Sequence, residues 1–146
     1  MKVDVFDYLE KLERSLLEKD KIEMSFARNW ASQFDGDAGV YAVYDKDELI
    51  YVGETGSLKG RMKDIRRTLN HSFRRSLGEK LYSGHKSYTK ATSSKKHIDE
   101  IELMLNEYCE ANIKISTLIV HLGRKELEEM MTEKYDRLLN TRLKRK

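Results

Sequence analysis

The residues of this chain with the clearest chemical potential are two tyrosines that lie near glycines and precede an arginine. The stretch from Gly39 to Arg61 reads GVYAVYDKDELIYVGETGSLKGR, with Tyr41 shortly after the first glycine and Tyr51 shortly before Gly53. A phenol has a pKa near ~10, so it exchanges protons near neutrality only beside a cation. A guanidinium can hold two phosphate oxygens and stabilise developing negative charge. The segment therefore suits chemistry at a phosphate group, with a purely structural role for strand tyrosines as the alternative.

The tyrosines are positioned by two predicted strands. Residues 39–45 and 49–55 are largely apolar and rich in β-branched and aromatic side chains, which is typical of strands joined by a short loop. Directly opposed residues of an antiparallel pair point to the same face of the sheet. A loop of three or five residues would therefore place Tyr41 opposite Tyr51, whereas a loop of two or four residues would separate them.

The other elements follow from the spacing of apolar residues. A β-branched run over residues 113–122, closed by Gly123, predicts a third strand, and the polar residues 83–96 predict a basic loop. Helical periodicity predicts helices over residues 3–18, 57–69, 73–81, 97–111 and 125–139. This order favours an α+β fold with a small antiparallel sheet. We expect residues 1–37 to form an N-terminal helical extension and residues 38–146 to form the main domain.

Charge is distributed unevenly along the chain. Residues 59–97 hold 12 basic and 2 acidic side chains, a net charge of +10 in a chain whose total is +3. A positive block between acidic segments indicates contact with a polyanion, and a solvated helical surface is the alternative. No apolar run is long enough to cross a membrane, and a single cysteine, Cys109, excludes an internal disulfide. We therefore expect a cytoplasmic protein, with a homodimer left open.

The two tyrosine motifs and Arg61 resemble those of the GIY-YIG nuclease superfamily. Gly39-Val40-Tyr41 is similar to the first motif, and Tyr51-Val52-Gly53 is similar to the second. The resemblance covers residues 38–140 and implies a three-stranded antiparallel sheet flanked by helices, to which this chain adds an N-terminal helix. It also implies a DNA endonuclease that uses one divalent metal ion, Mg²⁺ or Mn²⁺. In this reading Tyr41 activates water, Tyr51 and Arg61 hold the phosphate, and Gly39 and Gly53 are structural.

The last predicted helix supplies the metal ligand in the same resemblance. The family carries a helical glutamate ahead of an asparagine, as Glu128 stands ahead of Asn140 here, and Asn140 is expected to tie the helix end. Helical geometry places Glu128 inside the apolar arc of its helix. That arc is formed by Leu127, Met130, Met131, Tyr135, Leu138 and Leu139. A carboxylate there needs a metal or an ion-pair partner, and both alternatives stay open.

Two positions depart from the family pattern. Many members carry histidine or tyrosine where Ile65 stands, and His71 is the nearest replacement as an assisting catalytic residue. Repair members often carry lysine where Glu54 stands, so the site loses a positive charge and gains a second acid. These departures leave two alternatives to an active nuclease: a catalytically inactive DNA-binding module and a protein-interaction domain.

The basic block supplies the expected DNA contacts. Such contacts go to phosphates and give affinity without sequence information. The residues assigned to them are Lys59, Lys63, Arg66, Arg67, Arg74 and Arg75. In length, and in the region from Arg61 to Arg75, the chain is most similar to small restriction- or phage-type members.

Overall fold

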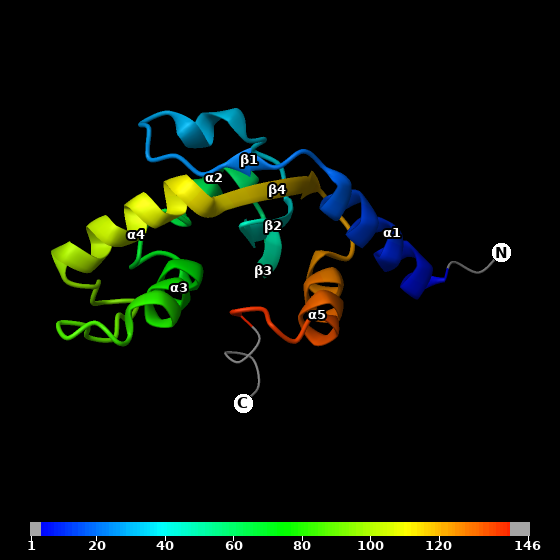
Figure 1. The fold of residues 1–146 in the computed structure, drawn as a ribbon. Helices are drawn as coiled ribbons and strands as arrows, with labels where there is room; N and C mark the ends of the chain where they lie inside the picture. Colours follow the sequence, from blue (N-terminus) through cyan, green and yellow to red (C-terminus); the bar gives the residue numbers. More distant parts are fainter. Residues whose placement is uncertain (1–3, 141–146) are drawn as a thin grey trace.

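The computed structural model describes residues 4–140 and has an α+β architecture (Figure 1). Five helices surround an antiparallel sheet with the strand order β1-β4-β2-β3. In chain order, the elements are α1 (Val5–Glu18), β1 (Ile22–Glu23), a 3-10 helix (Trp30–Gln33), β2 (Gly39–Asp45), β3 (Glu48–Thr55), α2 (Leu58–Asp64), α3 (Ser72–Tyr82), α4 (Asp99–Asn112), β4 (Ile113–Ile119) and α5 (Arg124–Lys134). None of the helices within residues 4–140 is long and apolar enough to span a membrane.

The sheet has four strands, so the prediction of three strands was wrong. The additional strand is β1, which pairs with β4 through Ile22 and Ile115 and through Glu23 and Lys114. It lies in a segment that the sequence analysis treated as part of the helical extension. A strand of two residues shows no alternation of apolar and polar side chains, so periodicity could not find it.

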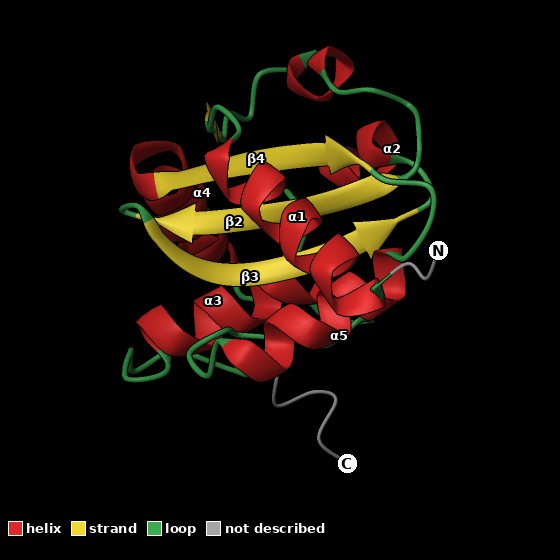
Figure 2. Cartoon of the chain, turned by 90° about the vertical axis from the view of Figure 1, so that its right-hand side faces the viewer, coloured by secondary structure: helices red, strands yellow, loops and turns green. Residues whose placement is uncertain are grey.

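Helices cover both faces of the sheet (Figure 2). On one face, α1 and α5 pack on the sheet and bury a cluster that includes Leu9, Leu16, Val40 and Leu127. On the other face, α2, α3, α4 and the 3-10 helix bury a larger cluster. Both tyrosines of the predicted site belong to this second cluster. The site is therefore built on the sheet face opposite α1.

The β2–β3 hairpin keeps both tyrosines on one face although its loop has the length that was expected to separate them. Its loop has two residues, Lys46 and Asp47, both with positive φ, as in the mirror-image turns that favour tight hairpins. Such a loop was expected to separate the tyrosines. The register shifts by one residue, however, where Val43 pairs with Tyr51 but Tyr44 pairs with Leu49, which leaves Ile50 as the extra residue of a β-bulge. From the bulge onward, each side chain of β3 points to the opposite sheet face from the one it would have in a regular strand. Tyr51 therefore lies on the same face as Tyr41.

Two helices end earlier than their apolar patterns predicted. Helix α2 stops at Asp64 rather than at residue 69, and α5 stops at Lys134 rather than at residue 139. Leu138 and Leu139 are buried, but they lie beyond the helix. The Leu139 amide instead donates to the Ile50 carbonyl at 2.8 Å, so this segment covers the open edge of β3. Leu138 and Leu139 are therefore buried because this segment packs against β3, and not because the helix continues through them.

A buried carboxylate joins α1 to the end of α5. Glu13 is 4% exposed, and its carboxylate accepts hydrogen bonds from Lys134 Nζ at 3.0 Å and from the Tyr135 hydroxyl. Burial, followed by the bond to Glu13, raises the pKa of Tyr135 to about 12, so this phenol stays a donor. The residues that meet here are 121 and 122 positions apart in sequence. Glu13 therefore holds the N-terminal helix against the last helix.

We expect Glu13→Ala to lower the free energy of unfolding by about 1–3 kcal/mol. The change removes hydrogen bonds to a charged group and leaves the Tyr135 hydroxyl without its acceptor. Lys134 is half-exposed and remains hydrated, so the loss stays below that of a fully buried ion pair. Urea unfolding measures the effect. Glu18→Ala, at an exposed position of the same helix, is the control, and an equal loss in both variants would contradict this role of Glu13.

Candidate active site

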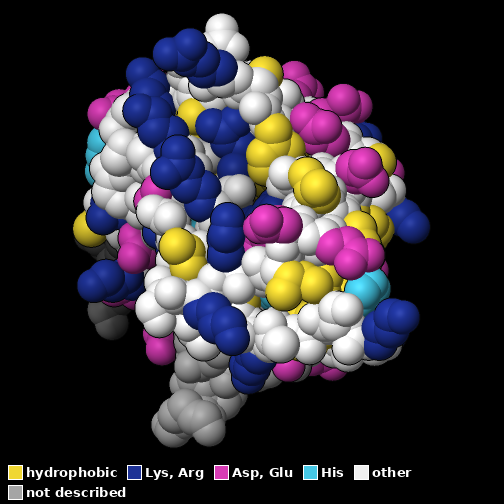
Figure 3. Space-filling view, turned by 90° about the vertical axis from the view of Figure 1, so that its left-hand side faces the viewer, with side chains coloured by type: hydrophobic (Ala, Val, Ile, Leu, Met, Phe, Trp, Pro, Cys, Tyr) yellow, Lys and Arg dark blue, Asp and Glu magenta, His cyan; other side chains and the backbone are white. Residues whose placement is uncertain are grey.

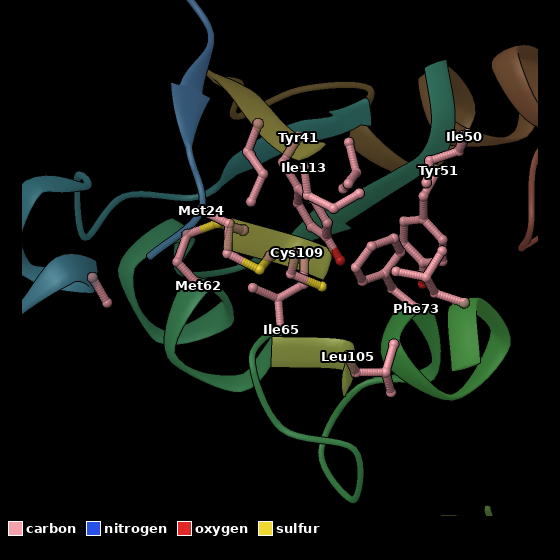
Figure 4. Packing of buried hydrophobic residues seen from close by; sticks show 14 of the residues in the cluster. Met24, Tyr41, Ile50, Tyr51, Met62, Ile65, Phe73, Leu105, Cys109 and Ile113 are labelled. Carbon is pink, nitrogen blue, oxygen red and sulfur yellow. The ribbon is translucent and has the colours of Figure 1, made fainter. Parts of the chain in front are cut away.

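Tyr41 and Tyr51 project from the same face of the β2–β3 hairpin. Their ring centroids are 6.3 Å apart with an interplanar angle of 21°. Tyr41 lies directly opposite Gly53, two residues along from Tyr51, so the pair is diagonal rather than directly opposed. Figure 4 shows both rings beside Phe73, whose own centroid is 5.6 Å from that of Tyr51. The prediction that one face carries both tyrosines is confirmed, although by a different register.

The Tyr41 ring lies across the backbone of Gly53. A Cβ atom at residue 53 would stand 2.2 Å from Cζ of Tyr41 and 2.3 Å from its hydroxyl oxygen. No side chain fits at that separation, so glycine is required for the ring to reach this position. Gly39 is constrained in a similar way, because a Cβ there would stand 2.3 Å from the Leu118 carbonyl oxygen. Packing against a neighbouring residue therefore requires glycine at both positions.

His71 donates a hydrogen bond to Tyr41. The distance between His71 Nε2 and the Tyr41 hydroxyl is 2.7 Å, and His71 Nδ1 accepts from the Phe73 amide at 3.0 Å as the N-cap of α3. Because Nδ1 accepts, a neutral ring carries its proton on Nε2. Burial, followed by Arg61 and Arg75, lowers the pKa of His71 well below its usual value, so the ring is neutral near pH 7. His71 therefore directs an N–H group at the phenol and does not receive its proton while the cap persists.

Arg61 provides a second donor to the same oxygen. Its Nε lies 3.4 Å from the Tyr41 hydroxyl, and its Nη1 lies 3.9 Å from Asp64. Burial, followed by Tyr51, raises the pKa of Tyr41 above its usual value, and Glu128 raises it further, while Arg61 opposes this shift. The resting phenol is consequently neutral. Two N–H groups directed at its oxygen would nevertheless stabilise a phenolate once another cation approached.

Ser72 belongs to the site, although the sequence analysis did not select it. Its hydroxyl lies 3.1 Å from the hydroxyl of Tyr51, at the first turn of α3. The clue in the sequence was that Ser72 directly follows His71, a residue already assigned to the site. One short segment thus gives a partner to each tyrosine: His71 contacts Tyr41, and Ser72 contacts Tyr51.

The two candidate acids lie in different environments. Glu128 on α5 is half-buried and close enough to Tyr41 to influence its pKa. Glu54 on β3 accepts a hydrogen bond from Arg124 Nε at 3.1 Å, so its charge is already paired. Within residues 4–140, no group of three or more His, Cys, Asp or Glu side chains could hold a metal ion. A cation at this site would therefore depend on one carboxylate, with water and phosphate oxygens completing its shell.

A model of a known protein family matches the part of the chain that carries most of this site. The model of the GIY-YIG catalytic domain matches residues 37–112. The chain belongs to the GIY-YIG catalytic domain family. The matched segment contains Tyr41, Tyr51, Arg61 and His71, whereas Glu128 and Asn140 lie beyond its end.

One solved structure is similar to this chain. It is the GIY-YIG N-terminal endonuclease domain of UvrC from Thermotoga maritima, solved as a point mutant bound to its catalytic divalent cation. The alignment has 16% sequence identity and a TM-score of 0.40, and it covers 90% of this chain and 96% of that chain. No protein with a curated description matches the sequence.

Two other positions at which the sequence was compared with the GIY-YIG pattern serve the core. Ile65 is 1% exposed and packs in the larger cluster, so the proton-transfer position of many family members is apolar here. Asn140 lies beyond α5, where its Nδ2 donates to the Val52 carbonyl at 2.7 Å. It therefore ties the chain to β3 rather than to the end of a helix.

The structure removes Arg74 from the predicted DNA surface. This side chain is 2% exposed, and its Nη2 donates to Glu102 at 2.9 Å and to Asn106 at 2.6 Å. Its Nε donates to the Thr68 hydroxyl at 2.9 Å. The sequence could not distinguish Arg74 from its neighbour Arg75 because the acidic partner lies 28 residues away on α4.

The other predicted DNA-contacting residues differ in exposure. Lys63 and Arg67 are exposed, whereas Lys59, Arg66 and Arg75 are half-buried. Arg66 stacks over Trp30 at 5.2 Å and donates to two backbone carbonyls of residues 25 and 27, so part of its guanidinium has a structural role. On the side of the molecule seen in Figure 3, lysine and arginine side chains gather toward the upper left, and a group of acidic side chains lies toward the right.

Gly53→Ala tests the close approach of Tyr41. The added methyl group forces the buried ring to move, and overpacking of this kind costs about 1–3 kcal/mol in the free energy of unfolding. Urea unfolding measures the change. Gly56→Ala is the matched control, because a Cβ at residue 56 meets nothing within 4 Å. Tyr41→Ala in the Gly53→Ala background should relieve the clash, and purely additive effects of the two changes would contradict it.

The lowered pKa of the buried His71 ring predicts a pH dependence of stability. The unfolded chain takes up a proton on this ring near pH ~6.5, while the folded protein does so only at lower pH, so stability falls as the pH drops below about 6.5. The buried His97, whose pKa is also lowered by burial, adds to the effect. His71→Gln removes the contribution of this ring to the pH dependence of the free energy of unfolding, which is up to about 1.4 kcal/mol per pH unit.

Urea unfolding of both proteins at about pH 5.5 and about pH 7.5 measures this contribution. The stability difference between the parent protein and His71→Gln should be smaller at the lower pH. An identical difference at both values would show that the His71 ring is not held neutral.

Proposed function

We propose that this protein is a DNA endonuclease that hydrolyses phosphodiester bonds with the help of a divalent cation. The observation that carries the proposal is the Tyr41 oxygen, toward which His71 and Arg61 both direct N–H groups. A tyrosine with a purely structural role in a sheet has no need of two cationic or polarised donors. Membership of the GIY-YIG family, whose matched segment includes all three residues, supports the same function.

The side chains divide the reaction among themselves. Once Tyr41 has released its own proton to solvent, its Oη takes the proton of the attacking water, and the N–H groups of His71 and Arg61 stabilise the phenolate form that can accept it. Arg61 stabilises the charge that develops on the phosphate oxygens. The hydroxyls of Tyr51 and Ser72, which lie 3.1 Å apart, are the proposed hydrogen-bond donors to the same phosphate. His71 keeps Tyr41 oriented through the cap of α3.

The residues present fit a hard divalent cation. Glu128 offers a half-buried oxygen ligand near Tyr41, and the site has no thiolate ligand, because Cys109 is buried elsewhere with its pKa raised to about 12 by burial. Carboxylate, phosphate and water oxygens suit Mg²⁺ or Mn²⁺. When bound, such an ion lowers the pKa of a coordinated water and neutralises phosphate charge. A cytoplasmic location, a restriction role and a homodimer stay predictions from the sequence.

Glu128→Gln separates the metal-ligand role from a structural one. The amide is a poor ligand for a hard cation, so cleavage of supercoiled DNA with Mg²⁺ or Mn²⁺ should fall at least about 100-fold while the fold is kept. If Glu128 is instead half of an ion pair, the change should lower stability, by less than the ~3–5 kcal/mol of a fully buried pair because Glu128 is half-buried. Cleavage assays, with EDTA as the blank, and melting temperatures measure both.

Glu129→Gln, at an exposed position on the same helix, controls for general damage. A stable Glu128→Gln protein that cuts at the parental rate would remove Glu128 from the mechanism. A parent protein that binds DNA but never cuts it with either metal would favour the inactive DNA-binding module.

A further inference from the structure

A polar groove lies beside α3, and its lining reaches Ser72, the hydrogen-bond partner of Tyr51. It has a volume of about 520 Å³. The residues that line it are Ser72, Arg75, Ser76, Glu79, Lys80, Ser83, Lys90 and Ala91. Only Arg75 among them belongs to the expected DNA contacts, and the catalytic proposal uses only Ser72.

The exposed face of α3 forms one wall of this groove. Ser72, Ser76, Lys80 and Ser83 recur at helical spacing, whereas Phe73 and its neighbours on the opposite face are buried. The small serine side chains leave the surface hollow and offer hydroxyl donors. A helix of 11 residues is about 16 Å long, so the groove can follow an extended ligand well beyond the tyrosines.

The second wall comes from the segment 83–96, which is held in place by its own contacts. Ala91 is buried, and the Thr92 amide donates to the Lys95 carbonyl at 2.7 Å. Tyr88 packs against His97, with ring centroids 5.6 Å apart. The backbone on either side of Lys90 is therefore held by packing and hydrogen bonds, while the Lys90 side chain is exposed.

The charges of the groove favour an anionic ligand. Three basic side chains face one acid, Glu79. Arg75 donates from Nη1 to the carbonyls of Thr68 and Leu69 at 2.8 and 3.2 Å, which fixes the direction of its guanidinium. Neither Lys80 nor Lys90 forms an ion pair or a side-chain hydrogen bond with any residue in the part of the chain that the structure describes. Basic side chains and hydroxyls are the groups that typically contact the sugar–phosphate backbone of DNA.

We propose that this groove binds the backbone of one DNA strand on one side of the scissile phosphate. The direction, away from the tyrosines along α3, rests on the proposed function, because it assumes that cleavage occurs at Tyr41. The groove contacts phosphates through Arg75, Lys80 and Lys90 and contributes affinity without sequence preference. The proposed substrate is therefore a DNA strand that extends along the groove from the reacting phosphodiester.

The binding test compares the parent protein with Lys80→Gln/Lys90→Gln. Fluorescence anisotropy with a labelled DNA duplex in EDTA, over a series of salt concentrations, measures affinity without cleavage. Each lost phosphate contact should reduce the slope of log K against log salt by about 0.9. Lys11→Gln/Lys19→Gln has the same charge change and should keep the parental slope, because Lys11 lies on α1, over the opposite sheet face, and Lys19 directly follows that helix.

A cleavage test distinguishes this proposal from the proposed function. With Mg²⁺ or Mn²⁺, the Lys80/Lys90 variant should hydrolyse the small diester thymidine 5′-p-nitrophenyl phosphate at the parental rate, but its KM for oligonucleotides should rise. A parental salt slope in this variant would overturn the groove proposal whether or not the enzyme cuts. If the parent binds DNA but cuts no substrate, the proposed function fails, while the slope in EDTA still decides for or against the groove.

Discussion

The contact between the Tyr41 ring and the backbone of Gly53 is the constraint on which the site depends. The ring reaches its position only because residue 53 has no side chain, and it meets Tyr51 only because the bulge at Ile50 turns β3 by one residue. From this position the hydroxyl contacts His71 from one segment and Arg61 from another. The position of the Tyr41 hydroxyl therefore depends on the sheet register, on the absence of a Cβ atom at residue 53 and on two hydrogen-bond donors from different elements.

His71 connects this oxygen to the helix that follows. One ring nitrogen caps α3, and the other binds Tyr41, so the direction of the helix and the protonation of the phenol depend on the same imidazole. The family position at Ile65 is apolar, and the histidine reaches the tyrosine from six residues further along the chain. A polar side chain thus lies beside the tyrosine but comes from a different segment, which also contributes Ser72 to the proposed DNA groove.

The sequence predicted the parts of the fold that are fixed by local patterns. The bounds of β2 were exact, and the glycines, tyrosines and Arg61 were selected by their resemblance to the family motifs. The sequence missed features that depend on distant partners. Arg74 is buried because Glu102 lies beside it, and the chain leaves the helix after Lys134, where carbonyls of β3 accept hydrogen bonds from Leu139 and Asn140. The bulge at Ile50 was also invisible, since no local rule distinguishes it from a regular strand.

The bond between Glu13 and the end of α5 has a consequence for how the protein is made. The central strand β2 lies between β3, its neighbour in sequence, and β4, which is synthesised much later. Helix α5, which carries Glu128, follows β4 and is held by a helix from the start of the chain. Contacts between such distant segments form late in folding because long loops must close first. A chain still on the ribosome before α5 emerges therefore carries the tyrosines, Arg61 and His71 but lacks the proposed metal ligand.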